Sequence, residues 1–285
     1  PVNGGMWFAI KPEPDEDGHG VPWDEASRVK SQYHTVYALL GVAAATVANR
    51  PGAHELLNRM LEEQKELWTD DFGRVWDEYD EAFTEAVPVH TLGTLIHTIE
   101  AYMAAAEATT EPEWLDRAEK MAAFAYKVAS KNGWRIPEYF DENWEANHEA
   151  GKLLNDGRRY YEGYVTGHSM QLARFALQVR AGLRSMGWDV PDYLLEMGTE
   201  LFERARVDGW RRTDACPGFS TGVDDEGDPI PGEDEHQQWV VCEGVCAAVA
   251  VRRAMLDDGA RVSDVEHFEH CYRSFVDYIH DYLIS

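Results

Sequence analysis

The 285-residue chain is short of basic residues, and this shortage argues against two classes of partner. It carries 26 Lys and Arg against 52 Asp and Glu, a formal net charge of −26. Nucleic-acid binding depends on cationic groups that neutralise phosphates, so no nucleic-acid partner is expected. Anionic lipid surfaces attract clusters of Lys and Arg, and the sequence contains no such cluster. The acidity is most simply that of a solvated, solubilising surface.

Membrane spans, disulfide frameworks and phosphate-binding motifs are also missing from the sequence. No apolar run approaches the length of about 18 residues that a membrane helix needs. The four cysteines form no C-x-x-C pair, so no disulfide framework is expected and a cytoplasmic location fits. HExxH, a Gly-rich phosphate loop and a G-x-S-x-G elbow are absent. Hydrophobic residues make up 44% of the chain, which therefore has the composition of a globular protein.

Helical periodicity organises the sequence. Apolar residues recur at three- and four-residue steps in eight segments, and such stripes face a core. No alternating run is long enough for a major sheet. The predicted helices cover approximately 25–48, 53–69, 89–107, 111–130, 167–187, 190–206, 237–256 and 262–284.

Short and long connections alternate along the chain, so that the helices form pairs. The long connections contain Gly and aromatic residues and then an acidic tip of the kind that makes a turn. They cover 4–18, 71–83, 132–144 and 217–229. We expect short β-hairpins or extended loops there, on one face of the molecule, and loops of this length are usually functional. The repeat predicts an all-α toroid of helix hairpins; an open helical scaffold that binds a protein on its concave face is the alternative.

Titratable residues stand near the start of the first helix of each pair. These are His34, His97, His168 and Glu243, at intervals of 63, 71 and 75 residues that follow the repeat. A lone histidine on a helix is more often structural, but three at one level favour a shared site. In a toroid these side chains would converge on the axis, where imidazoles suit proton transfer near neutral pH.

Helical spacing adds two neighbours to this candidate site. Gln171 lies three residues after His168, and Trp239 lies four before Glu243, so each pair shares a helix face. An indole can cover the C–H face of a sugar while a carboxylate accepts bonds from its hydroxyls. Packing in the core is the alternative role for Trp239.

No metal or cofactor is expected. His267, His270 and Cys271 have helical spacing, but they lie on a predicted outer helix where a surface role is favoured. Cys242 and Cys246 are better explained as small buried apolar residues than as ligands.

From about residue 3 to its end, the chain resembles the N-acylglucosamine 2-epimerase superfamily, and within it the D-mannose isomerase/sulfoquinovose isomerase branch. The order and spacing of several segments together carry the resemblance. They are GGMWFAIKP, KSQYHTVYALLGVAAA, HTIEAYMAAAEATTEPEWLDRA, PEYFDENW, YVTGHSMQLARF and GFSTGVDDEGDPIPGEDEHQQWVVCEG. The resemblance implies a single (α/α)6 barrel domain over residues 1–285, incomplete at both ends. It also implies sugar isomerisation or 2-epimerisation without a cofactor.

The resemblance implies a role for each candidate residue. His168 matches the acid/base histidine of the P-G-H-x-x-E motif, and His97 matches a histidine that lines the sugar site. Trp239 and Glu243 match the W-x-x-x-E motif, which packs on the sugar, holds its hydroxyls or assists ring opening. His34 and Gln171 are expected to bind substrate. The implied chemistry runs through a cis-enediol, with a histidine moving the proton between C2 and C1.

The chain departs from the family pattern at several positions. Thr166 replaces the usual Pro, Gln171 replaces the usual Glu, and Gly93 and Ile96 replace the Asn and Met of the second motif. A family Arg is expected upstream of Pro1 and a second acid/base His after Ser285. These two residues would complete the predicted site.

Four functions follow from these patterns. We favour an aldose–ketose isomerase acting on a sugar such as mannose, followed by a 2-epimerase of N-acylglucosamine or cellobiose type. An inverting glycosidase would need two separated carboxylates, Glu138 or Asp141 with Glu243. The fourth is a non-catalytic carbohydrate-binding protein. The expected ligand is a monosaccharide or disaccharide, and a homodimer is left open.

Overall fold

The computed structural model describes residues 3–70, 73–155, 157–211 and 217–284, which form two compact units. Unit 1 comprises Pro1–Met121 and Tyr139–Tyr160. Unit 2 comprises Ala122–Glu138 and Tyr161–Ser285. The division falls within helix α4 (Pro112–Lys131).

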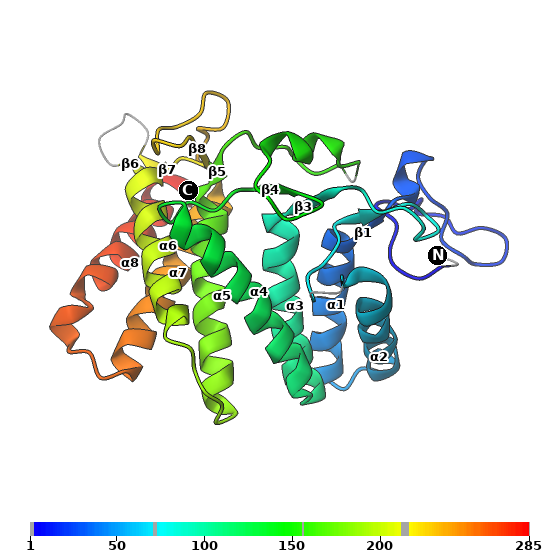
Figure 1. Cartoon of the computed structure of the whole chain (residues 1–285), viewed down its shortest axis with the longest axis horizontal. Coiled ribbons are helices and arrows are strands. Elements are labelled where there is room, and N and C mark those ends of the chain that lie inside the picture. Colours follow the sequence, from blue (N-terminus) through cyan, green and yellow to red (C-terminus); the bar gives the residue numbers. More distant parts are fainter. Residues whose placement is uncertain (1–2, 71–72, 156, 212–216, 285) are drawn as a thin grey trace. The chain divides into compact units, whose positions relative to one another are not determined.

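Unit 1 is built on three helices and the first part of α4. Helix α1 (Gln32–Val47) packs against both α2 (Ala53–Glu63) and α3 (Leu92–Thr109), as Figure 1 shows. A π-helical turn, Gln64–Trp68, extends α2. The apolar stripes of these helices are buried as their periodicity predicts. The core includes Leu39, Leu57, Trp68, Leu92, Ile96, Ile99 and Trp114.

Unit 2 contains the second two helix pairs. Helix α5 (Thr166–Ser185) packs against α6 (Tyr193–Gly209) and α7 (Gln238–Asp257), and α7 packs against α8 (Glu266–Tyr278) (Figure 1). A π-helical turn, Ile279–Leu283, extends α8. In the part of the chain described, no helix is both long enough and apolar enough to cross a bilayer.

The eight predicted helices are present, but four begin at least three residues later than predicted, including α6, which starts at Tyr193 rather than at 190. The first starts at Gln32, after a short 3-10 turn at Ala26–Arg28 and strand β1 (Lys30–Ser31). Strand β3 (Val89–Thr91) takes the first three residues predicted for α3. A 3-10 turn at Val262–Asp264 precedes α8. Apolar spacing over three residues fits a strand and a helix equally, so for α1 and α3 the pairing of β1 and β3 with distant segments decided where the helix begins.

Short hairpins form around the four acidic tips, as predicted, and each is closed by one antiparallel bridge: Ile10 with Pro22, Tyr79 with Ala86, Phe140 with Ala146, and Val223 with Pro229. The longer strand pairs join other segments. β1 pairs with β2 (Glu78–Tyr79) across α1 and α2, and β3 pairs with β4 (Tyr139–Asp141) across α3 and α4. In unit 2, β5 (Tyr164–Val165) pairs with β8 (Gly222–Val223). Only β6 (Trp210–Arg211) and β7 (Gly218–Phe219) are near neighbours in sequence among the described strand pairs. Each long loop is therefore fixed by the segment before a helix, because strands this short need support beyond a local hairpin.

The acidic tips of the four long loops are turns, as predicted. In each, an aspartate Oδ1 accepts two backbone N–H bonds from residues two to five positions later. These are Asp15, Asp80, Asp141 and Asp224. The hydroxyl of Thr84 and backbone N–H groups hold the pKa of Asp80 below its ordinary value. Part of the chain's acidity thus serves its turns.

Candidate active site

The start of α5 is held against the loop that carries β7 and β8. The backbone N–H of Thr166 donates to the carbonyl of Thr221 at 2.9 Å. Its hydroxyl donates to the backbone carbonyl of Ser220 at 2.7 Å. Proline has neither of these donors, so Thr166 makes two bonds that the usual proline of the family pattern could not make. Gly167 follows, and a Cβ there would lie 2.4 Å from the indole of Trp239. Glycine therefore lets α7 bring its tryptophan onto the first turn of α5.

This arrangement presents His168 beside the indole. The imidazole and Trp239 rings have their centroids 5.4 Å apart, and the ring of Tyr161 stands edge-on at 6.5 Å. Nδ1 of His168 lies 2.7 Å from Oε2 of Glu138. The histidine side chain is 17% exposed and the glutamate 4%, so solvent reaches the imidazole while its partner is buried.

Glu243 is held one turn further along α7. Both its oxygens accept bonds from Arg174 on α5, each at 3.0 Å. Bidentate pairs of this kind are geometrically specific. The arrangement suits Glu243 to accept bonds from hydroxyl groups rather than to donate a proton. Gln171, on α5 between His168 and Arg174, is buried.

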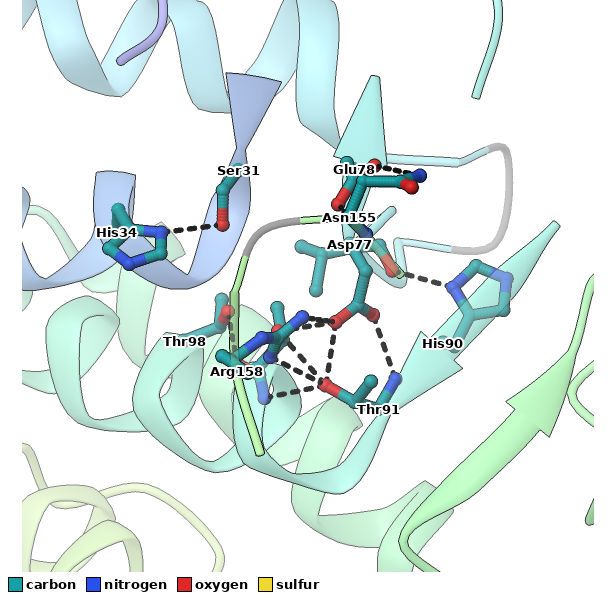
Figure 2. Close-up of polar contacts among 11 residues, drawn as sticks. Ser31, His34, Asp77, Glu78, His90, Thr91, Thr98, Asn155 and Arg158 are labelled. Carbon is teal, nitrogen blue, oxygen red and sulfur yellow. Dashed lines mark hydrogen bonds and ion pairs between the residues drawn. The ribbon is translucent and has the colours of Figure 1, made fainter. Parts of the chain in front are cut away.

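Unit 1 holds the other two predicted histidines. Nε2 of His97 lies 2.8 Å from the hydroxyl of Tyr37, and Nδ1 lies 3.1 Å from Oε2 of Glu100. His34 pairs through Nδ1 with the Ser31 hydroxyl at 2.8 Å (Figure 2). The ring of Tyr33 stands edge-on to both histidines, with centroids 5.5 Å from each.

Arg158 is a functional candidate that the sequence analysis missed. Its guanidinium bonds to Oδ1 of Asp77 at 3.0 Å and to the hydroxyls of Thr91 and Thr94 (Figure 2). It also lies over the ring of Tyr33, 4.7 Å from the centroid. The only signal in the sequence was a pair of arginines in an acidic, glycine-containing segment ten residues before His168.

The same segment is fixed from its other side. Both carboxylate oxygens of Glu78 bind Asn155, one through the backbone N–H and one through the side-chain amide (Figure 2). Glu78 is fully buried. Two buried acids therefore fix this segment: Glu78 binds Asn155, and Asp77 binds Arg158.

His90 is a buried histidine outside these groups. Its ring stacks on Trp144 with centroids 4.0 Å apart and lies 4.7 Å from the ring of Trp76. Nδ1 lies 3.0 Å from the carbonyl of Val75 (Figure 2), and burial lowers the pKa of the imidazole. Its role is to hold the core of unit 1 together.

In the His267–Cys271 segment, His267 lies at the surface as favoured, whereas Cys271 is buried. Cys242 and Cys246 are exposed, which corrects the prediction that they are buried. His267 pairs with Glu203 at 2.7 Å, and burial raises the pKa of the Cys271 thiol to about 11. A metal would need the thiolate. Among the described residues, no three His, Cys, Asp or Glu side chains have the arrangement of a metal site.

The structure thus brings the predicted residues together in two groups. His168 contacts Trp239 in unit 2, with Glu243 and Gln171 on the same two helices, and His34 and His97 both contact Tyr33 in unit 1. Convergence of the two groups on one axis stays a prediction.

The carboxylates proposed for a glycosidase have other partners. Glu138 binds His168 and Glu243 binds Arg174. Asp141 accepts the backbone N–H bonds of its own turn. None of these contacts favours the glycosidase.

Helix hairpins that carry an imidazole, a buried carboxylate and an indole at one helix start define an α/α protein with a candidate acid/base site. The family model of N-acylglucosamine 2-epimerase (GlcNAc 2-epimerase) matches residues 14–285, and the chain belongs to this family. The predicted membership is confirmed. The mostly helical structure has neighbours of the (α/α)6 toroid type, as the predicted fold class requires.

Two curated relatives are D-mannose isomerases. That of Thermobifida fusca is 31% identical over 281 residues, covering 96% of this chain and 65% of the relative. That of Pseudomonas cannabina pv. alisalensis is 28% identical over 250 residues, covering 87% and 57%. The chain therefore spans less than two thirds of the length of either relative.

Two solved structures share the fold. A D-mannose isomerase superposes with a TM-score of 0.77 at 20% identity, covering 94% of this chain and 66% of that one. A sugar epimerase from a ruminal bacterium gives 0.69 at 14% identity, covering 93% and 62%.

Proposed function

We propose that the protein is a sugar isomerase that interconverts an aldose such as mannose and its ketose by proton transfer through an enediol. The observation that carries this proposal is the His168 imidazole, which is partly exposed, is held through Nδ1 by Glu138, and lies against the indole of Trp239. The similarity to two D-mannose isomerases supports the choice of substrate.

The chemistry needs one base that can return the proton it takes. Nε2 of His168 removes the proton from C2 of the open-chain aldose, the C–H electrons form the C1=C2 bond, and the carbonyl oxygen O1 gains a proton. The resulting cis-enediol takes the proton at C1 from the same imidazole while O2 loses its own, which gives the ketose. Positioned general acid–base groups contribute about 10²–10⁴-fold to such steps.

The other residues have binding roles in this proposal. Trp239 covers the C–H face of the sugar, and Glu243, fixed by Arg174, accepts bonds from its hydroxyls. His97 and His34 remain predicted sugar-site residues. Tyr37 and Glu100 hold both ring nitrogens of His97, so the ring is fixed in place. This suits His97 to hydrogen bonding.

A 2-epimerase is the second candidate, because the family model carries that name. Epimerisation returns the proton to C2 on the opposite face of the enediol plane, so it needs a second proton donor facing His168. Isomerisation through a cis-enediol needs only one face. His168 can supply proton transfer on one face of the enediol, which is all that isomerisation needs. This favours the isomerase.

The test is incubation of the purified chain with D-mannose, followed by ¹H and ¹³C NMR in D₂O. Fructose formation that is abolished in His168→Ala supports the isomerase. Deuterium at C2 with glucose formed and no ketose supports the epimerase. The control variant His54→Gln changes an exposed histidine on α2. Turnover by His168→Ala equal to that of the control would contradict the mechanism.

A cytoplasmic location is part of the proposal, supported by the free thiols of Cys242, Cys246 and Cys271. Homodimerisation stays open, and light scattering of the purified chain measures it.

A further inference from the structure

Glu138 is bound at both of its carboxylate oxygens, and the two partners differ in kind. Oε1 accepts the backbone N–H of Val165 at 3.1 Å, and Oε2 meets Nδ1 of His168 at 2.7 Å. We infer that Glu138 is a positioning residue that keeps the His168 proton on Nδ1 and so leaves Nε2 as the acid/base atom. The inference rests on the proposed function of His168.

The assignment of the proton follows from the donors and acceptors present. A backbone N–H can only donate, and an ionised carboxylate can only accept. Nδ1 of His168 therefore has to donate to Glu138. A neutral imidazole carries one proton, so its lone pair lies on Nε2.

The surroundings of Glu138 make this contact rigid. The residue is 3% exposed and follows two buried residues, Ile136 and Pro137. Arg135, just before them, forms a bidentate pair with the buried Asp208 and also donates to the carbonyl of Asp225. A buried carboxylate is costly unless its hydrogen bonds are made, so both bonds of Glu138 are strongly favoured.

Glu138 also accounts for the departure at Gln171. The family pattern leads to a carboxylate one turn after His168, and this chain has a neutral amide there. Glu138 supplies a carboxylate to the imidazole from a different segment. The other charged groups of this face, Arg174 and Glu243, bind each other. Tyr161 presents only its ring edge to His168.

Unit 1 repeats the same arrangement. Asp77 precedes β2 as Glu138 precedes β4, and it too binds the start of a following helix. It accepts from the backbone N–H of Thr91 and from the guanidinium of Arg158. In each unit, a buried carboxylate just before a long loop's strand therefore binds a backbone N–H and a functional side chain. The carboxylate is that of Asp77 in unit 1 and that of Glu138 in unit 2.

The decisive variant is Glu138→Gln. Its amide has one acceptor oxygen, and when that oxygen serves Val165 N–H, the NH₂ group faces Nδ1 of His168 and moves the ring proton to Nε2. We expect kcat on D-mannose to fall about 100-fold or more, with KM changed only a few-fold. In ¹⁵N-labelled full-length protein, the His168 ring should change from the Nδ1–H to the Nε2–H tautomer.

Two further variants separate positioning from folding. Glu138→Ala removes the acceptor of the Nδ1 proton altogether, so kcat should again fall while KM changes only a few-fold. Glu142→Gln changes an exposed acid four residues along and should match wild type in every readout. Circular dichroism checks that each variant is folded.

Retention of kcat and of the Nδ1–H tautomer in Glu138→Gln would overturn the inference. The tautomer is measured without substrate. A wild-type chain that shows the Nδ1–H tautomer, lost in Glu138→Gln, but does not convert mannose would contradict the proposed function and leave the positioning contact standing.

Discussion

Arg174 and Glu243 join α5 to α7 by a two-bond ion pair, with each side chain 18% exposed. The pair lies one turn beyond the contact between His168 and Trp239. It fixes the carboxylate proposed to bind sugar hydroxyls, and it links the two helices that carry the site.

Replacing Arg174 by Met should weaken substrate binding more than catalysis. The carboxylate of Glu243 would lose its orientation, so KM for mannose should rise about tenfold while kcat changes less. Leaving a partly buried acid without its partner should also destabilise the fold by about 1–3 kcal/mol. Steady-state kinetics and urea unfolding measure the two effects.

A surface pair provides the control for that experiment. Arg261 and Asp264 make a similar ion pair, but the arginine is 82% exposed. Arg261→Met should cost less than about 1 kcal/mol. Equal losses in the two variants would show that the Arg174 pair has no special role.

Gly167→Ala should disturb the site by steric overlap. The added methyl group would lie 2.4 Å from the Trp239 ring, so the indole or the start of α5 has to move. We expect at least about a tenfold loss of kcat/KM, since small misplacements at a site are costly, with a shift in tryptophan fluorescence.

Gly41→Ala is the matched helical control for Gly167. A Cβ at Gly41 on α1 meets nothing within 4 Å. Alanine should there be neutral or stabilising by up to about 1 kcal/mol, with unchanged activity. An active Gly167→Ala variant with native fluorescence would contradict the packing argument.

His90 should make the protein less stable in mild acid. Burial lowers its pKa below the ordinary value of 6.5, despite the nearby carboxylates of Asp77 and Asp70, and Arg74 acts in the same direction as burial. The unfolded state then binds the proton more readily, so stability is complete above pH 6.5 and falls as the pH drops toward the folded-state pKa. Thermal melts between pH 7.5 and about 5 measure the slope.

His90→Phe keeps a flat ring between Trp76 and Trp144 but cannot take a proton. Its stability should vary less over that pH range than that of wild type, even though it loses the bond to Val75. The exposed His54→Gln variant should keep the wild-type slope. A wild-type slope in His90→Phe would exclude His90 as its cause.

Lys30 should make the stability of the folded protein increase with pH in the alkaline range. Burial lowers its pKa from 10.5 to about 8, although Glu81 and Glu63 favour the charged form. Between these two values the unfolded state holds more protons, so stability should rise as the pH increases from about 8 toward 10.5. Lys30→Met should remove that rise, and melts of both proteins in this range test it.

The helices, the turns and four residues of the candidate site were predicted from the sequence for local reasons. Helical periodicity and aspartate-led turns are encoded within a few residues, and the spacing of Trp239 and Glu243 fixes them on one helix face. The starts of α1 and α3 were predicted too early because β1, β3 and their partners pair across whole helix hairpins.

The sequence by itself determined the helix pairs, the acidic surface and the placing of His168 at a helix start. Only the tertiary structure decided what holds the functional side chains. Glu138 is 30 residues from His168, Arg174 is 69 from Glu243, and Arg158 is 81 from Asp77. Burial selects such partners because a charged group removed from water needs an opposite charge or a hydrogen bond. Which distant residue supplies it depends on how the loops pack, and no local pattern records that choice.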